Sequence, residues 1–381
     1  MAGVTKWLEP EVLYKGESSG GNMVVKYTTF ANNTFYAIGV PIVHWRNPLG
    51  PTWSYVVPQN GKVTLVDTGM PGSMELLVQG LNKLDYSISD VGAVVITHGH
   101  MDHDGNVAQV AQQSGARIIA HEVYAKLLNA DLYRRDQQMG RDGRTISPDM
   151  QQFQDSVSSL AEAKKNLKDV HSVVEGDRFG DFTFFYTPGH AADELCILLK
   201  DILFTGDHLL PMITPHPTLA SMYERAREHL PHGYRHGNKY YGIKVYLQAL
   251  KKVHQMRKDL MAMPAHRLYF DDKFHIFGVE RADEILNHHV ERFGKILSLT
   301  REKPKLMEDM LPLLFQERHL HGRGWYMAIS ELQAHLEVLK EAQDIEYVGE
   351  GGKLIRATGT QNFLKLIEDL EPYESLIPLP K

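Results

Sequence analysis

Short apolar runs separated by turns dominate the first 120 residues of the chain. Several of these runs are rich in β-branched and aromatic residues, and the Asn60-Gly61 pair between two of them is typical of a hairpin turn. The continuous apolar run over 91–96 predicts a strand that is buried on both faces. Strands are predicted at 35–40, 54–57, 63–66, 91–96 and 117–121, and helices at 74–81 and at 107–115, the latter with a glycine stop. Strands that alternate with helices predict an α/β fold.

The middle of the chain combines further strands with two longer polar segments. Residues 123–167 are charged and largely helical in pattern, and they are longer than a simple connection requires, so we expect an insertion over one edge of the core. Residues 211–241 are rich in His, Pro, Tyr and Arg, and we expect a cover segment, either a plain loop and helix over the core or a lid over a site. Strands are predicted at 182–186, 195–199 and 202–204.

From Arg281 the pattern changes to long helical periodicity. An apolar stripe predicts a first helix, a second is predicted over about 305–315 with Pro312 as a kink or early stop, and a third over 325–341. Residues 345–356 then predict a hairpin with a glycine-rich turn. Three helices and a terminal hairpin suggest a winged-helix module. A chain of 381 residues suits a large domain and a small one, which we place at 1–280 and 281–381.

The composition narrows the class of protein. With 43% hydrophobic and 23% charged residues and no long apolar run, the chain is expected to be soluble, and without a signal-peptide pattern at its start it is expected to be cytoplasmic. A net charge of −6 gives no electrostatic reason to bind nucleic acid or anionic lipid. The lone cysteine, Cys196, cannot form an internal disulfide and lies in an apolar run that predicts a buried strand.

The chemistry is concentrated just after the predicted strand 91–96. His98, His100, Asp102 and His103 lie within six residues, in the loop position where open α/β sheets bind ligands. Imidazole and carboxylate together suit zinc, iron or manganese, and the absence of thiolates argues against a structural cysteine-type zinc site. The pattern therefore predicts a metal site.

Three further candidate ligands occur in similar settings. His190 follows a predicted strand at Thr187-Pro188-Gly189, Asp207 follows another at Thr205-Gly206, and His266 lies beyond an expected helix. All three mark the ends of elements, and this shared context favours convergence with the first group on one cleft. From the cover segment, His208, His216, His232, His236 and Tyr241 could also reach such a cleft.

These motifs resemble those of the metallo-β-lactamase superfamily. The resemblance runs from Asp67 to His266, and its most specific element is the His-x-His-x-Asp-His pattern from His98 to His103. It implies an αββα sandwich, followed here by the smaller winged-helix-like domain. It also implies two metal ions, one bound by His98, His100 and His190, the other by Asp102, His103 and His266, with Asp207 bridging them.

The resemblance also implies a hydrolytic mechanism. Two cations, with zinc the first expectation and iron or manganese open, lower the pKa of a bound water, so the expected nucleophile is a metal-held hydroxide. Asp102 is expected to orient this nucleophile or accept its proton, and Asp67 to support the ligands from outside. After His190 the chain reads Ala191-Ala192-Asp193-Glu194, where many relatives carry a second histidine, which puts functions that need that histidine in doubt.

Several functions remain open from the sequence. The leading hypothesis is hydrolysis of a carboxylic ester or thioester in a small-molecule substrate, as in glyoxalase II-like relatives, and the alternative is phosphodiester cleavage of RNA. Between Arg281 and Arg356 the chain has 11 Lys or Arg against 13 Asp or Glu, and this net negative charge does not favour binding to the phosphates of RNA. The C-terminal module is therefore expected to serve packing, substrate shaping or homodimer formation. A metal-stabilised binding or regulatory protein is a further alternative, and a redox role like that of diiron relatives would need a separate electron partner.

Overall fold

Two β-sheets packed face to face form the centre of the protein. The computed structural model describes residues 9–29, 32–43, 49–128, 163–164, 167, 170–317, 320 and 323–380. The first sheet has eight strands in sequence order, of which β5 to β8 are parallel to one another and the others are antiparallel. Its strands are β1 (Glu11–Tyr14), β2 (Val24–Thr28), β3 (Thr34–Val40), β4 (Thr52–Gln59), β5 (Lys62–Val66), β6 (Val91–Val95), β7 (Arg117–His121) and β8 (Val170–Val173).

The second sheet has six strands in the order β16-β13-β12-β11-β10-β9. Only β12 and β13 are parallel within it, while the other pairs are antiparallel. Its strands are β9 (Arg178–Phe179), β10 (Phe182–Tyr186), β11 (Leu195–Leu199), β12 (Ile202–Gly206), β13 (Met261–Pro264) and β16 (Phe277–Gly278). A small hairpin, β14 (Tyr269–Phe270) with β15 (Lys273–Phe274), lies between β13 and β16 in the chain.

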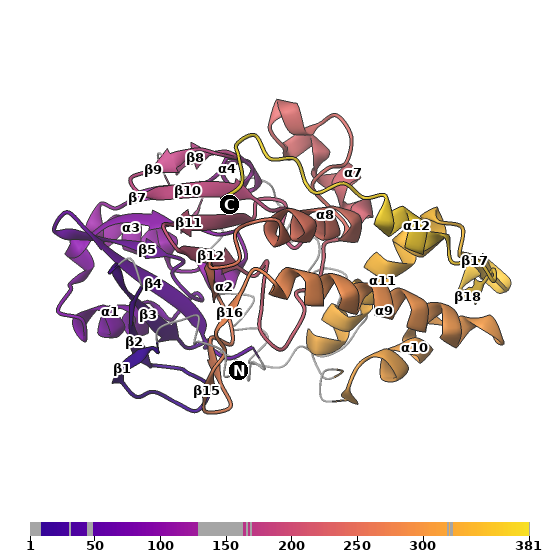
Figure 1. Cartoon of the computed structure of the whole chain (residues 1–381), viewed down its shortest axis with the longest axis horizontal. Helices are drawn as coiled ribbons and strands as arrows, with labels where there is room; N and C mark the ends of the chain where they lie inside the picture. Colours follow the sequence, from indigo (N-terminus) through magenta and orange to yellow (C-terminus); the bar gives the residue numbers. More distant parts are fainter. Residues whose placement is uncertain are drawn as a thin grey trace.

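Helices cover the outer face of each sheet, so the described residues form the αββα arrangement that the resemblance predicted (Figure 1). On the first sheet lie α1 and α3, and on the second lie α8 and α9, which make extensive contact with each other. The helices are α1 (Met74–Asn82), α2 (Met101–Asp104), α3 (Val107–Ser114), α4 (Glu122–Leu127), α7 (Tyr223–Ala226), α8 (Ile243–His254), α9 (Arg281–Arg301), α10 (Met307–Leu314), α11 (Arg323–Glu341) and α12 (Asn362–Glu368).

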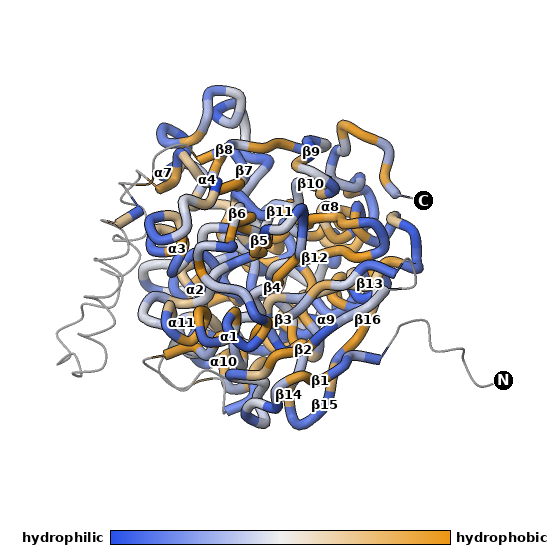
Figure 2. Tube along the Cα trace, turned by 90° about the vertical axis from the view of Figure 1, so that its left-hand side faces the viewer, coloured by the Kyte–Doolittle hydropathy of each residue, from blue (hydrophilic) through white to orange (hydrophobic). Residues whose placement is uncertain are grey.

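Alternation along the strands explains how both faces of each sheet are buried. Side chains on a strand point to opposite faces in turn. In β10, Phe184 therefore packs between the two sheets, whereas Phe185 packs against the helices behind. In β4, Tyr55 and Val56 divide in the same way. The hydropathy tube shows the result, with apolar strands inside and polar loops and helix faces outside (Figure 2).

The chain after residue 280 packs against the second sheet through the same apolar core as α8. This core joins Leu203 of β12 and Leu250 of α8 with Phe293, Leu332 and Ile355 further along the chain. The predicted helices and hairpin are present, the hairpin as β17 (Ile345–Val348) and β18 (Leu354–Ala357), and Pro312 lies inside α10 near its end. The winged-helix identity of this module and the boundary at 280 stay predictions.

The last described residues return along α8 toward β10 (Figure 1). The Tyr373 amide donates to the Gln248 carbonyl at 2.9 Å, and the Arg257 amide donates to the Pro380 carbonyl at 2.6 Å. This return segment, residues 369–380, was not predicted from the sequence.

Other differences from the sequence prediction are local. The strands β1, β2 and β13 and the helix α12 had not been predicted. A helix was expected before His266, and α8 precedes it, but strand β13 lies between this helix and His266. Most of the predicted insertion at 123–167 lies outside the described residues, apart from most of α4 and residues 163, 164 and 167. In the part of the chain that the structure describes, no helix combines the length and apolar content needed to cross a membrane.

Candidate metal centre

The seven predicted ligands lie at one edge of the two sheets, in the loops that follow strands. His98 to His103 follow β6, and His100 begins helix α2 as its N-cap residue. His190 follows β10, Asp207 follows β12, and His266 follows β13. Since β12 and β13 are parallel neighbours, their carboxyl ends lie together and bring Asp207 and His266 to the same place. The structure thus brings all seven residues together as predicted.

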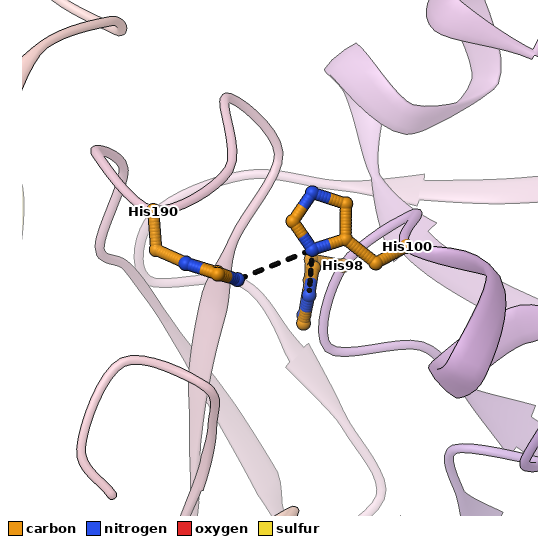
Figure 3. A group of neighbouring side chains, drawn as sticks. All are labelled: His98, His100 and His190. Atoms are coloured by element: carbon orange, nitrogen blue, oxygen red, sulfur yellow. Dashed lines mark hydrogen bonds between the residues drawn. The ribbon is translucent and has the colours of Figure 1, made fainter. Parts of the chain in front are cut away.

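Three imidazole rings converge in the first group (Figure 3). His100 Nδ1 lies 2.9 Å from His98 Nε2 and 3.1 Å from His190 Nε2. The rings of His98 and His190 stand nearly perpendicular to that of His100, with interplanar angles of 80° and 87°. Three nitrogens that point at one another are the donor set expected around a single cation.

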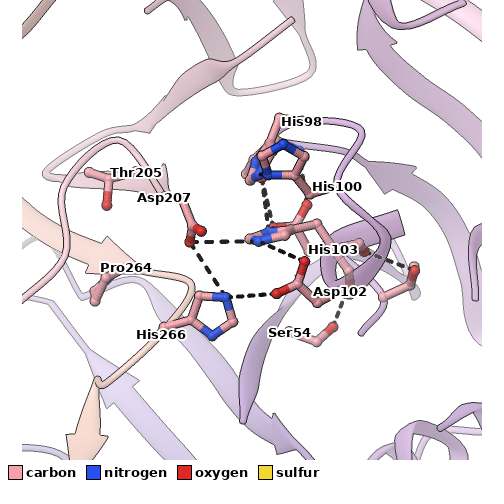
Figure 4. Close-up of polar contacts among 12 residues, drawn as sticks. Ser54, His98, His100, Asp102, His103, Thr205, Asp207, Pro264 and His266 are labelled. Carbon is pink, nitrogen blue, oxygen red and sulfur yellow. Dashed lines mark hydrogen bonds and ion pairs between the residues drawn. The ribbon is translucent and has the colours of Figure 1, made fainter. Parts of the chain in front are cut away.

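The second group combines two imidazoles with two carboxylates (Figure 4). His266 Nε2 lies 3.3 Å from Asp102 Oδ2 and 3.6 Å from Asp207 Oδ1, and His103 Nε2 also lies 3.6 Å from Asp207 Oδ1. The other oxygen of Asp207, Oδ2, lies 3.6 Å from His190 Nε2 of the first group. Asp207 is therefore placed between the two groups, with one carboxylate oxygen toward each.

The outward nitrogens of the rings determine which tautomer each histidine adopts. His190 Nδ1 lies 2.8 Å from the His216 carbonyl, and His266 Nδ1 lies 3.0 Å from the Pro51 carbonyl. Since a carbonyl only accepts hydrogen bonds, each Nδ1 carries the proton and each Nε2 keeps a lone pair. His103 is fixed in the same way by the Asp67 carboxylate, 2.8 Å from its Nδ1. The inward nitrogens of all three rings are thus prepared to bind a cation.

Asp67 holds this arrangement from an unusual backbone position. Its φ is +61°, in the left-handed region that an aspartate tolerates better than most residues. Its Oδ1 accepts from the Thr97 amide at 2.9 Å, and its Oδ2 accepts from the Thr97 hydroxyl at 2.8 Å as well as from His103. Asp67 is 1% exposed, so its lone pairs are shared only with protein groups. Asp67 thus joins the His103 ring to the start of the loop that carries His98, and its supporting role stays a prediction.

The electrostatics divide the histidines into two kinds. Burial lowers the pKa of His100 and of His190 to about 4, so both rings are neutral ligands at pH 7. Burial also opposes the charged form of His103, but the neighbouring carboxylates of Asp207 and Asp102 raise its pKa well above the ordinary value. Without an ion, a proton on His103 balances part of the carboxylate charge. Binding of a cation replaces this proton.

Unsatisfied buried atoms show that the residues fit metal ions. His103 Nε2, His266 Nε2 and Asp207 Oδ1 are buried without a hydrogen-bond partner among the described residues, and all three point into the space between the two groups. Leaving such atoms without a partner costs about 1–3 kcal/mol each. A divalent cation is the partner that imidazole and carboxylate share, and the ligand types suit zinc, iron or manganese. The site therefore has the composition and the arrangement of a metal centre.

Two acids that the sequence prediction did not assign support the same loops. Asp193 Oδ2 accepts from the Gly99 amide at 2.8 Å, and Glu194 Oε1 accepts from the Asp207 amide at 3.1 Å while lying 3.9 Å from His98 Nδ1. Burial raises the pKa of Asp193 to about 7 and that of Glu194 well above its ordinary value. They occupy the Asp-Glu pair after His190, where the sequence had been noted only for lacking a second histidine.

The cover segment lies against the site through its backbone. The His216 carbonyl accepts from His190, and the Thr218 amide and hydroxyl donate to the Gly189 carbonyl at 2.7 and 2.8 Å. His208 is fully buried behind the site, whereas His232 and His236 lie on the surface beside each other. Of the side chains proposed to reach the cleft from this segment, His216 packs edge-on against His190, with ring centroids 5.2 Å apart.

Comparison with known proteins identifies the family. The profile of the metallo-beta-lactamase superfamily matches residues 47–270, more than half of the chain and all seven candidate ligands. The chain therefore belongs to the metallo-β-lactamase superfamily. A metallo-β-lactamase family protein from Thermus thermophilus has the same fold, with a TM-score of 0.61 and 22% identity over 85% of this chain and 98% of that one.

Curated relatives match a shorter part of the chain. A metallo-beta-lactamase fold-containing protein of Sulfurisphaera tokodaii is 25% identical over 40% of this chain and 55% of its own length. A probable polyketide biosynthesis zinc-dependent hydrolase of Bacillus velezensis is 25% identical over 43% of this chain and 60% of its own. A hydroxyacylglutathione hydrolase of Haemophilus influenzae is 24% identical over 45% of this chain and 70% of its own. The chain thus spans little more than half the length of the first two.

Proposed function

We propose that the protein is a hydrolase that uses two divalent metal ions, zinc in the first instance, to cleave a carboxylic ester or thioester. The observation that carries this proposal is the convergence of His98, His100, His190, Asp102, His103, His266 and Asp207 with their lone pairs directed at one another. The names of two relatives, a zinc-dependent hydrolase and a hydroxyacylglutathione hydrolase, support the reaction class.

The side chains divide the work of such a reaction. His98, His100 and His190 would hold one ion, Asp102, His103 and His266 the other, and Asp207 both. When bound, the ions supply a water of lowered pKa and polarise the scissile carbonyl.

Asp102 is the protein group best placed to handle the proton of the attacking water. It is more exposed than its neighbours, with 20% of its side chain accessible against 0% for His103 and His266. Although burial opposes ionisation, His103 and His266 hold the pKa of Asp102 well below its usual range, so the carboxylate is charged at pH 7 and can orient the water by accepting a hydrogen bond.

A panel of substrates tests the proposal. The purified protein is assayed with a thioester, a lactone, a bis-phosphodiester and single-stranded RNA, each with and without a chelator. We expect thioester or ester turnover that the chelator abolishes, and loss of this turnover in His100→Ala with the fold retained. His232→Ala, at an exposed histidine away from the site, is the matched control. Metal analysis by mass spectrometry distinguishes zinc from iron and manganese.

The other outcomes support the alternatives. RNA cleavage without ester cleavage replaces the proposal with a ribonuclease, despite the acidic balance of residues 281–356. Stoichiometric metal without turnover of any substrate in the panel favours a metal-stabilised binding protein. Absence of bound metal after purification and reconstitution refutes the proposal.

A further inference from the structure

Two charged side chains from the C-terminal helices hold the backbone of the cover segment. Arg281, the first residue of α9, donates from Nε to the Leu210 carbonyl at 2.9 Å and from Nη2 to the Ile213 carbonyl at 3.0 Å. Glu337 on α11 accepts from the Ala220 amide at 2.7 Å and from the Ser221 amide at 3.2 Å. Hydrogen bonds to a charged group are about twice as strong as neutral ones, so these contacts anchor the first part of the segment, from Leu210 to Ser221, at both of its ends.

The Glu337 contact also caps a helix that cannot cap itself. Ala220 and Ser221 begin the short helix η3 (Ala220–Met222), and its N-cap residue, Leu219, has no side chain that accepts a hydrogen bond. A carboxylate at this position satisfies two amides that the helix leaves free and complements the positive end of the helix dipole. Glu337 is more than a hundred residues away in sequence and supplies what the local sequence lacks.

Between the two anchors, the cover segment touches the loop that carries His190. The His216 carbonyl accepts from His190 Nδ1 at 2.8 Å, and Thr218 donates twice to the carbonyl of Gly189. The Gly242 amide in turn donates to the Thr218 hydroxyl at 2.9 Å. The tautomer of His190, and with it the lone pair on Nε2, therefore depends on a backbone segment that the C-terminal helices hold in place.

We propose that Arg281 and Glu337 are positioning residues for His190, and that the C-terminal module serves the metal centre through them. The inference rests on the proposed function in one respect, because it assigns an ion to His98, His100 and His190. It predicts an asymmetry. Loss of either anchor weakens binding of the ion assigned to His190, whereas binding of the ion assigned to Asp102, His103 and His266 is unaffected, since in the described residues the hydrogen bonds and ion pairs of these three side chains run to groups outside the cover segment.

Metal titration of the full chain tests the asymmetry. The variants are Glu337→Ala and Arg281→Met, and the matched controls are Glu341→Ala and Glu284→Ala, which remove the exposed partners of Lys244 and Arg281 without touching the cover segment. Stepwise affinities for Co²⁺ are measured with a competing chelator, together with the visible spectrum of the cobalt-loaded protein.

In the anchor variants, we expect one of the two Co²⁺ affinities, that of the ion assigned to His190, to fall by about 10-fold or more, while the other stays within about 2-fold of wild type. In the control variants, both affinities stay within about 2-fold of wild type. In the anchor variants, we expect the visible spectrum to change for the cobalt ion assigned to His98, His100 and His190 and to stay as in wild type for the other ion. Anchor variants that bind both ions with wild-type affinity and spectrum overturn the inference.

A second variant keeps the inference testable if Glu337→Ala does not fold. Glu337→Gln keeps one acceptor for the Ala220 amide, so we expect it to fold as wild type and to show a smaller loss of affinity than Glu337→Ala. If Glu337→Ala does not fold and Glu337→Gln binds both ions as wild type does, the inference fails.

If the wild-type chain itself takes up no ion, the proposed function fails, and imidazole ¹⁵N signals of the metal-free chain decide the inference. His190 is then expected to be protonated at Nδ1 in wild type and to exchange between tautomers in the Glu337 variants. Unchanged signals overturn the positioning role.

Discussion

Replacement of Asp67 by asparagine tests the supporting contacts of the metal centre most directly. The change keeps the shape of the side chain, and asparagine accepts the left-handed φ of +61° at least as readily as aspartate. It exchanges one carboxylate oxygen for an NH₂ group. Oδ1 accepts from the Thr97 amide and Oδ2 accepts from His103 Nδ1, so whichever oxygen is replaced, a donor will face a donor.

The two orientations of the new amide have different costs. With the NH₂ group toward His103, that ring must accept at Nδ1 and carry its proton on Nε2, where a cation is to bind. Loss of the hydrogen-bond partner that orients a metal-binding histidine weakens metal affinity about 10- to 100-fold, which corresponds to about 1.4–2.7 kcal/mol of binding free energy. With the NH₂ group toward Thr97, a buried amide loses its acceptor at a cost of about 1–3 kcal/mol in folding stability.

The first orientation is expected to prevail, because the His103 ring can change tautomer and the Thr97 amide cannot. We therefore expect Asp67→Asn to bind one ion about 10- to 100-fold more weakly, with a smaller change in stability. Competitive chelator titration and urea unfolding measure the two effects. Asp85→Asn is the matched control, since Asp85 has the same backbone conformation, with φ +60°, on the surface. An Asp67→Asn protein with wild-type affinities and wild-type stability would refute the tautomer argument.

Three further predictions concern parts of the fold outside the metal centre. Burial lowers the pKa of His121 to about 3, so stability falls as the pH drops below about 6.5, and His121→Asn, which keeps the helix cap on the Val123 amide, flattens this slope by about 1.4 kcal/mol per pH unit between about pH 4 and 6. Lys252→Met leaves the buried Glu175 carboxylate without its cation and destabilises the fold by about 3–5 kcal/mol in urea unfolding. Burial raises the pKa of the Cys196 thiol, so thiol reagents should modify it only as the protein unfolds.

Each of these predictions has its own control. The slope of His121→Asn is compared with that of wild type, and an unchanged slope contradicts the assigned pKa direction. Glu346→Gln removes a pair with Arg356 that is about half exposed, and it should cost less than about 1 kcal/mol. If it costs as much as Lys252→Met, burial does not account for the difference. Modification of Cys196 at the same rate in native and unfolded protein would show that the strand opens readily.

The strands and the ligands were predictable because their signals are local. The run over 91–96 and the His-x-His-x-Asp-His pattern that follows it are contiguous in the sequence, and both the strand β6 and the ligand loop are observed. Asn60 and Gly61 have positive φ angles of 51° and 75°, as the predicted hairpin turn requires. Where a few adjacent residues determine the outcome, the sequence was sufficient.

The features that could not be predicted depend on contacts between distant residues. Glu337 meets the Ala220 amide across 117 positions, and Tyr55 donates to the Pro264 carbonyl across 209. Strand β13 consists of the short sequence Met-Ala-Met-Pro, which lacks the alternation of apolar and polar residues that indicates a strand. It forms a strand because it pairs with β12. The supporting acids Asp193 and Glu194 have no motif of their own, and only their burial beside Gly99 and Asp207 reveals their role.

The division of the ligands between the two sheets has a consequence for the lifetime of the protein in a cell. His98 to His103 follow a strand of the first sheet, and His190, Asp207 and His266 follow strands of the second, so unfolding of either sheet would separate the ligands proposed for each ion. Ligands that bind only the native state stabilise it by mass action, by about 2.7 kcal/mol for each ion present at a hundred times its dissociation constant. We therefore expect the chain to be degraded faster under metal starvation, so that its abundance follows the cellular supply of free metal.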